Sequence, residues 1–345
     1  MQRSRITIID LAQELGMSKS TVSRALRHHP NVSKATRERV LAKAKELNYR
    51  PNRIAQNLVH RQTRTIGVVI PDVSFPYFSK TLSAAQKAAE QAGYQIMICQ
   101  SGESFQAECR AIDTLVDNQI DGLLISLSQE TQDYEHLVPL LNDEVPVVMF
   151  DRVIESKRFP RVVMDNHGGA KQAVEHLVQQ GYRRIAHLAG PETLMVSQQR
   201  VVGYLDAHEA TGLPVDESLV LNLGFRREHG EAGVRQLFAL DNPPDAILAV
   251  TDSVAIGAKL ALEALGKRIP DEVGLVGFNN EAFTEYVEPM LSTVSLPMAE
   301  LGKKGMEMLL AHLNGAENPV ADREMLGASL IVRESSKGPS GKSHD

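Results

Sequence analysis

The sequence contains only two cysteines, Cys99 and Cys109, and no histidine or cysteine spacing typical of a metal site surrounds them. We therefore expect both thiols to be reduced and buried, as in a cytoplasmic protein, and we expect no metal site. The chain has no run of eighteen apolar residues, which argues against a membrane span. Its first residues, MQRSRITIID, lack the apolar segment and the small-residue cleavage site of a secretory signal.

The sequence also lacks the short motifs of the common enzyme classes. It has no G-x-S-x-G nucleophile turn, no G-x-x-x-x-G-K-[ST] phosphate loop, no G-x-G-x-x-G dinucleotide motif and no H-E-x-x-H zinc motif. We therefore expect neither catalysis nor a bound cofactor.

Charge is distributed unevenly along the chain, although the net charge is only −6. Residues 1–64 contain fourteen Lys or Arg and four Asp or Glu, whereas the rest of the chain contains twenty-three and thirty-nine. A cationic N-terminal region on an acidic body favours contact of that region with a polyanion. If the charged residues only kept the surface solvated, we would not expect positive and negative charges to be separated along the chain in this way.

The cationic region begins with the run TIIDLAQELGMSKSTVSRAL, residues 7–26. Thr7 and Asp10 predict a capping box at the start of a first helix, and Gly16 tolerates the positive φ of its end. Ser18 is expected to cap a second helix that buries Val22. The opposite side of this second helix carries only cations and hydroxyl groups, namely Lys19, Ser20, Ser23, Arg24 and Arg27. Taken alone, this pair could be two solvated amphipathic helices, or a helix pair for the DNA major groove.

A third amphipathic segment follows Val32 and Ser33 and favours the DNA-binding alternative. Its expected buried stripe consists of Val40, Leu41, Ala44 and Leu47. Three short helices within residues 7–47 are typical of a small helical DNA-binding unit.

The runs ITIIDLAQELGMSKSTVSRAL and NVSKATRERVLAKAKELNYRPNRIAQNL resemble the N-terminal region of the lac-repressor family of bacterial transcription regulators. The segments T-V-S-R, N-Y-R-P-N-R and A-x-x-L carry the resemblance, which continues to about Glu334. It implies a helix-turn-helix DNA-binding domain at residues 1–50, a hinge helix and linker at 51–63, and a two-lobed effector-binding and dimerisation domain at 64–334. The polar composition of SSKGPSGKSHD predicts a disordered tail at 335–345.

The resemblance also implies a homodimer that binds a palindromic operator DNA. Lys19, Ser20 and Arg24 would face base edges. Contacts with the DNA backbone, which position the protein on the duplex, would come from Thr21, Ser23, Asn31 and Arg53. The expected DNA-binding residues also include Thr7 and Ser18. In the hinge, Leu58 would enter the minor groove as an apolar wedge and Ala55 would lie where the two copies meet. The adjacent His28 and His29 are expected near phosphates rather than on a metal.

Beyond residue 64, short apolar runs alternate with amphipathic segments. We predict strands at 65–70, 95–99, 122–126 and 145–150, and then at 161–164, 184–188, 246–250 and 273–277. The predicted helices lie at 77–92, 107–118, 170–180, 198–211, 230–240, 253–265 and 297–313, and a final strand at 330–332 is expected to return to the first lobe. Such strands predict parallel sheets covered on both faces, and two successive sets predict two lobes.

The expected fold class is therefore a small all-α helix-turn-helix head plus an α/β body of two doubly wound parallel-sheet lobes. The body resembles the periplasmic sugar-binding proteins. A transport or chemoreceptor protein of that kind is an alternative, but the missing signal peptide and the cationic head argue against it. An enzyme on the same scaffold is a further alternative, for which the absent motifs leave little support.

Ligands of open α/β sheets bind beyond the carboxyl ends of the strands. The candidate effector residues at these ends, some of them taken from the family motifs R-x-x-G-[YWF] and T-D-x-x-A-x-G, are Ser74, Phe75, Phe78, Asp151, Arg152, Arg200, Phe225, Asp252 and Asn279. Carboxylates and guanidinium groups suit a sugar because each can hold two adjacent hydroxyls. We expect a sugar, sugar acid or sugar phosphate as effector, acting as inducer or corepressor.

Some candidates have a structural alternative. Phe75 and Phe78 could belong to the core, and Asp252 could cap the helix that follows it, with or without touching the ligand. Asp165 and Asn166 are expected to cap the helix at 168–180 rather than to bind ligand. Asn279 stands where many family members carry aspartate, and with two arginines nearby this favours an acidic sugar or a sugar phosphate over a neutral sugar.

Overall fold

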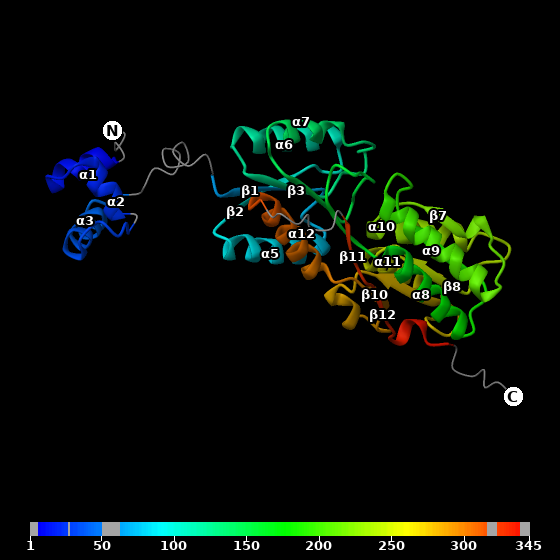
Figure 1. The fold of residues 1–345 in the computed structure, drawn as a ribbon. Coiled ribbons are helices and arrows are strands. Elements are labelled where there is room, and N and C mark those ends of the chain that lie inside the picture. Colours follow the sequence, from blue (N-terminus) through cyan, green and yellow to red (C-terminus); the bar gives the residue numbers. More distant parts are fainter. Residues whose placement is uncertain (1–5, 27, 50–62, 316–322, 339–345) are drawn as a thin grey trace. The chain divides into compact units, whose positions relative to one another are not determined.

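The computed structural model describes residues 6–26, 28–49, 63–315 and 323–338. The chain divides into two compact units, residues 1–63 and 64–345 (Figure 1). The hinge residues Arg53, Ala55 and Leu58 lie outside the described residues, as does Arg27. Within the described ranges, no helix combines the length and the apolarity that a membrane crossing requires.

The N-terminal unit contains α1 (Ile8–Leu15), α2 (Lys19–Leu26) and α3 (Lys34–Glu46). Their buried side chains form one cluster that includes Leu11, Leu15, Val22 and Val40. The expectation that Leu41 belongs to the buried stripe is wrong, because its side chain is 38% exposed. The inner side of α3 is filled by Val40 and Ala44, four residues apart, and the neighbouring position therefore turns outward.

The local signals at the start of this unit are confirmed. The Thr7 Oγ1 accepts from the backbone N–H of Asp10, and the Asp10 carboxylate accepts from the backbone N–H of Thr7, which is a capping box. Gly16 ends α1 with a φ of +62°. The Ser18 Oγ accepts from the backbone N–H of Thr21 at 3.2 Å, so Ser18 caps α2 as predicted.

The first lobe of the body is a parallel sheet between two pairs of helices (Figure 1). Its strands, in the order β11-β5-β4-β3-β1-β2, are β1 (Thr65–Ile70), β2 (Gln95–Gln100), β3 (Gly122–Ile125), β4 (Val147–Phe150), β5 (Arg161–Met164) and β11 (Arg323–Leu326). One face packs on α5 (Pro76–Gln91) and α12 (Met298–Leu313), and the other on α6 (Phe105–Asp117) and α7 (Val138–Asn142). Successive residues of β1 alternate between these faces: Val68 joins the α5 side and Val69 the α6 side.

The second lobe repeats this plan, apart from one antiparallel strand. Its strands, in the order β12-β10-β9-β8-β6-β7, are β6 (Ile185–Ala189), β7 (Val220–Asn222), β8 (Ala246–Ala249), β9 (Gly274–Phe278), β10 (Ser292–Ser295) and β12 (Ser329–Ile331). One face packs on α8 (Asn166–Gln179) and α9 (Met195–Thr211), the other on α10 (Arg227–Leu237) and α11 (Asp252–Ala264). Short 3-10 turns lie at Glu135–Leu137, Glu217–Leu219, Ala282–Glu285 and Glu334–Ser336.

The chain passes between the lobes three times through very short connections. Asp165 alone joins β5 to α8, residues 296–297 join β10 to α12, and residues 327–328 join β11 to β12. The backbone N–H of Asp165 donates to the carbonyl of Leu326 at 2.8 Å, which ties the first connection to the third. These connections place the carboxyl ends of both sheets opposite one another.

Several expectations about the body are corrected. The strand at 161–164 belongs to the first sheet, and the final strand, β12, pairs antiparallel with β10 in the second sheet rather than returning to the first. The strand that does return is β11, which pairs with β5.

Two expectations about burial are also wrong. Cys99 and Cys109 are free but half-exposed; Cys99 lies on the edge strand β2, and Cys109 is not among the buried residues of α6. The prediction of disorder from Ser335 is wrong for the start of that segment, because Ser335 and Ser336 are buried and hydrogen-bonded to β9 and β10, and residues 339–345 lie outside the described residues.

Candidate functional site

A cavity lies in the body where the carboxyl ends of the two sheets face each other. Both sheets have the strand order of doubly wound folds, whose ligands bind at this edge. Residues of the first lobe that line the cavity are Phe75, Tyr77, Phe78, Asp151 and Arg152. Those of the second lobe are Val196, Arg200, Phe225, Thr251, Ser253, Asn279 and Glu281.

On the first-lobe side, Tyr77 and Asp151 form a buried pair. The Tyr77 hydroxyl donates to Asp151 Oδ1 at 2.6 Å. Burial raises the pKa of Tyr77 well above its ordinary value, so the hydroxyl stays a donor. Burial also raises the pKa of Asp151, and the charge of Arg152 opposes that rise. Tyr77 lies in the run FPYF between two candidates, and the sequence analysis missed it.

Arg152 lines the cavity and is held by a glutamate that the sequence analysis did not identify. Its Nη1 donates to both carboxylate oxygens of Glu103, at 2.8 and 2.7 Å. The Arg152 guanidinium also lies 5.0 Å from the ring centre of Phe225, which belongs to the other lobe. Glu103 has a φ of +67°, a conformation that is rare for glutamate, and this turn directs the side chain toward Arg152.

Arg200 is the most deeply buried cation of the cavity, at 5% exposure. Its Nε donates to Asn166 Oδ1 at 3.0 Å, its Nη1 donates to the carbonyl of Val250, and its guanidinium lies 3.8 Å from the ring centre of Phe278. Burial lowers its pKa to about 10, so it stays charged at neutral pH. The expectation that Asn166 caps α8 is wrong, since it orients Arg200, whereas Asp165 is the predicted cap and accepts from Gly168 N–H at 2.8 Å.

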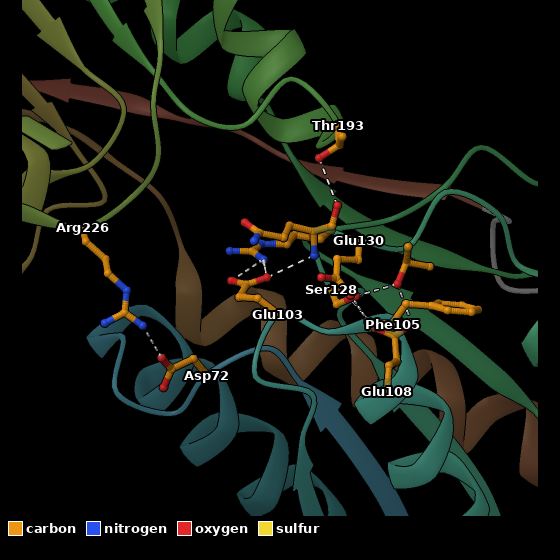
Figure 2. A network of polar contacts seen from close by, with 11 residues as sticks. Asp72, Glu103, Phe105, Glu108, Ser128, Glu130, Thr193 and Arg226 are labelled. Atoms are coloured by element: carbon orange, nitrogen blue, oxygen red, sulfur yellow. Dashed lines mark hydrogen bonds and ion pairs between the residues drawn. The ribbon is translucent and has the colours of Figure 1, made fainter. Parts of the chain in front are cut away.

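Two polar contacts join the lobes (Figure 2). Arg226 of the second lobe pairs with Asp72 of the first, at 3.2 Å between Nη2 and Oδ2. The Thr193 hydroxyl donates to the carbonyl of Gln129 at 3.0 Å. The backbone N–H of Gln129 in turn donates to Glu103, so the glutamate that holds Arg152 also holds the loop that meets the second lobe.

Asn279 and Glu281 follow β9 and face the cavity from the second lobe. The side-chain oxygen Oδ1 of Asn279 and Oε2 of Glu281 are buried and have no hydrogen-bond partner among the described residues. Burial raises the pKa of Glu281. The sequence analysis missed Glu281, which lies two residues beyond the candidate Asn279. A search of the whole segment that follows β9 would have found it.

Asp252 and Ser74 do not line the cavity. The N-cap of α11 is Thr251, not Asp252, so the capping alternative for Asp252 is wrong. Its carboxylate points inward and accepts from the Thr293 hydroxyl at 2.5 Å and from the Glu281 N–H at 2.7 Å. Burial raises the pKa of Asp252 to about 8. Ser74 is exposed and its N–H donates to Asp72.

The two phenylalanine candidates divide between cavity and core. Phe78 is 2% exposed and belongs to the core cluster of the first lobe while also lining the cavity. Phe75 is half-buried, and the Arg226 guanidinium lies 5.6 Å from its ring centre.

In the described ranges, no three His, Cys, Asp or Glu side chains lie close enough together to hold a metal ion.

In the N-terminal unit, α2 presents the predicted polar side. Lys19, Ser20 and Arg24 are exposed, and the Arg24 Nε donates to the carbonyl of Ser20 at 3.3 Å. Thr21 and Ser23 are half-buried. The other described candidates, Thr7, Ser18 and Asn31, are exposed at helix starts and loops.

Comparison with known sequences matches residues 7–52 to the family described as bacterial regulatory proteins, lacI family. Residues 63–332 match the periplasmic binding proteins and sugar binding domain of the LacI family. The HTH-type transcriptional repressor CytR of Escherichia coli (strain K12) is 32% identical over 336 residues, which cover 97% of this chain and 98% of that protein. The ribose operon repressor of Halalkalibacterium halodurans is 32% identical over 96% of this chain and 97% of its own length.

Solved structures of proteins with related sequences have the same fold as this chain. The lac repressor dimer bound to operator and the anti-inducer ONPF superposes with a TM-score of 0.84 at 26% identity, over 96% of this chain and 99% of that one. The complex of the transcriptional regulator CelR with cellobiose gives a TM-score of 0.73 at 29% identity, over 96% and 100% of the two chains.

Proposed function

This chain belongs to the LacI family of bacterial regulatory proteins, and from that membership we propose that it is a repressor of carbohydrate-utilisation genes whose operator affinity is set by a small sugar-like effector. The effector occupies the cavity between the lobes. The protein acts as a homodimer in the cytoplasm and carries out no catalysis.

The observation that supports this proposal most strongly is the make-up of the cavity. Aromatic rings from both lobes, Phe75 and Phe225, offer flat apolar surfaces, and Asp151, Arg152 and Arg200 offer paired acceptors and donors. Rings of this kind pack on the apolar face of a sugar, while carboxylate and guanidinium groups hold its hydroxyls. The related CelR structure contains cellobiose, a sugar.

The charges of the lining favour a hydroxyl-rich effector without a carboxylate. The charge of Arg152 is balanced by Glu103, which is only 18% exposed. Arg200 is close enough to Asp151 for each to affect the pKa of the other. Neither arginine therefore offers an uncompensated positive charge to an acid, and the preference for acidic sugars predicted from Asn279 loses its basis.

At the other end of the chain, we propose that α2 enters the major groove. Lys19, Ser20 and Arg24 contact base edges, while the backbone is positioned by Thr7, Ser18, Thr21, Ser23, Asn31 and Arg53. By resemblance to the family, Leu58 enters the minor groove and Ala55 meets its counterpart in the second copy. Effector binding changes the closure of the lobes, and this changes how the two copies engage a palindromic operator.

The test is selection of bound DNA from a random pool by the full-length protein, with and without a panel of sugars. We expect a palindrome of two half-sites whose recovery changes with one compound. An Arg24→Ala variant should lose base preference, and Leu58→Ala should weaken operator binding while leaving effector affinity unchanged. Absence of an enriched palindrome under every condition would contradict the proposed function.

A further inference from the structure

Glu281 is a buried carboxylate in the cavity without an ionic partner. It is 5% exposed, and its Oε2 has no hydrogen-bond partner among the described residues. Burying a carboxylate is costly unless it is paired or hydrogen-bonded. The other carboxylate that lines the cavity, Asp151, accepts a hydrogen bond from the Tyr77 hydroxyl at Oδ1 and lies within the electrostatic influence of Arg152 and Arg200.

Neighbouring charged groups do not supply the missing partner. Lys80, on α5 of the first lobe, lies close enough to oppose the rise in the pKa of Glu281, but among the described residues it donates no hydrogen bond to Glu281 Oε2. Asp252 accepts from the backbone N–H of Glu281, and the two carboxylates repel each other. Arg333 influences Asp252 and pairs with Glu285 instead.

The adjacent Asn279 is held so that its amide also faces the cavity. Its backbone N–H donates to Val294, and its φ of +105° is a strained value that the surrounding loop must maintain. Its Oδ1 has no hydrogen-bond partner among the described residues, so this edge of the cavity offers two acceptors. Arg152 and Arg200, which also line the cavity, offer donors.

We propose that the effector is an amino-bearing, sugar-like molecule whose nitrogen binds the Glu281 carboxylate. The amino group supplies both the hydrogen-bond donors and the positive charge that this carboxylate lacks. The hydroxyl oxygens of the same ligand face Arg152 and Arg200, and its ring packs between Phe75 and Phe225. Glu281 is thus the residue that selects an amine over the matching hydroxyl. This inference rests on the proposed function and specifies its ligand.

The test uses matched pairs of ligands and the full-length protein. Isothermal titration compares glucosamine with glucose and galactosamine with galactose, and it includes N-acetylglucosamine, whose nitrogen carries no charge. We expect the wild-type protein to bind one amine about tenfold or more tightly than its hydroxyl and N-acetyl partners, as charge-assisted hydrogen bonds outweigh neutral ones.

Glu281→Gln keeps the shape of the side chain and removes its charge, and it should abolish this preference because it weakens binding of the amine more than binding of the hydroxyl sugar. Glu288→Gln, the same change at an exposed position of the same lobe, should leave both affinities unchanged.

The outcomes separate the two proposals. Equal binding of amine and hydroxyl by the wild-type protein, or a preference that survives in Glu281→Gln, would overturn the assignment of Glu281 and leave the sugar-responsive repressor intact. If no sugar of either kind binds or alters operator affinity, both proposals fail. The comparison of ligands on the wild-type protein decides the matter even if the variant is unstable.

Discussion

Replacing Glu103 with glutamine should both destabilise the body and change the charge of ligand that it accepts. The Glu103 carboxylate receives both of its hydrogen bonds to Arg152 from one nitrogen, and the two side chains are 18% and 7% exposed. Glutamine keeps one acceptor oxygen but removes the negative charge. Arg152 then remains as a buried cation whose charge is no longer balanced.

The size of both effects follows from this geometry. Breaking a fully buried ion pair from one side costs about 3–5 kcal/mol, and the acceptor that glutamine keeps reduces this to about 2 kcal/mol. For a body of this size that corresponds to a fall in melting temperature of about 3 °C. A carboxylate about 5 Å from the freed Arg152 gains about 3 kcal/mol at an effective dielectric constant of about 20, and part of this is offset by desolvation. We therefore expect binding of an acidic sugar to improve about tenfold.

Thermal unfolding at pH 7 measures the first effect, and titration with glucuronate and glucose measures the second. Glu155→Gln is the matched control, because Glu155 pairs with Arg161 in the same lobe but is 60% exposed and does not line the cavity. It should change the melting temperature by less than about 1.5 °C. A Glu103→Gln protein with wild-type stability and no gain for glucuronate would refute the charge balance described for the cavity.

Two further predictions concern the stability of the second lobe. Burial lowers the pKa of His187 to about 4, from 6.5, so its contribution to stability is fully present above pH 6.5 and is lost as the pH falls through 4. The loss of stability is about 3 kcal/mol. The His187→Phe variant should therefore show a smaller fall in melting temperature between pH 7 and pH 4 than the wild-type protein, and an equal fall in both proteins would contradict this. A Cβ on Gly257 would lie 1.9 Å from the carbonyl oxygen of Arg227, so Gly257→Ala must separate α10 from α11 and should cost about 3 kcal/mol in urea unfolding. Gly327→Ala, where a Cβ meets open space, is its control and should be neutral; equal costs for both would show that the helices can adjust freely.

The parts of the fold that the sequence predicts well are those whose signals are local. The start of α1 follows from Thr7 and Asp10, and β1 is a run of apolar residues buried on both faces. By contrast, β11 reads REML, with two charges in four residues, because an edge strand buries little. Its pairing with β5 depends on residues about 160 positions apart, and no local pattern records such a pairing.

The residues of the candidate site also differ in whether a local sequence signal identifies them. Asp151 and Arg152 follow from the rule that ligands lie at strand ends. Glu103 escaped notice because its role comes from an ion pair across 49 positions of sequence. Asp252 also stands at a strand end, but it is the first residue of a helix, and its carboxylate accepts from Thr293 inside the lobe. A strand-end position therefore predicts proximity to the cavity but not the direction of the side chain.

The crossing of the chain between the lobes has a consequence for synthesis on the ribosome. The helix α5 emerges early, but α12, which covers its apolar side, begins about 200 residues later, and β11 follows α12 (Figure 1). At about 5–20 residues per second, α5 waits about 10–40 s for this cover. The five parallel strands of the second lobe are complete at Ser295, before α12 has been made. The second lobe thus has its five parallel strands before the first lobe receives α12 and β11, so the nascent first lobe exposes the apolar side of α5 for longer.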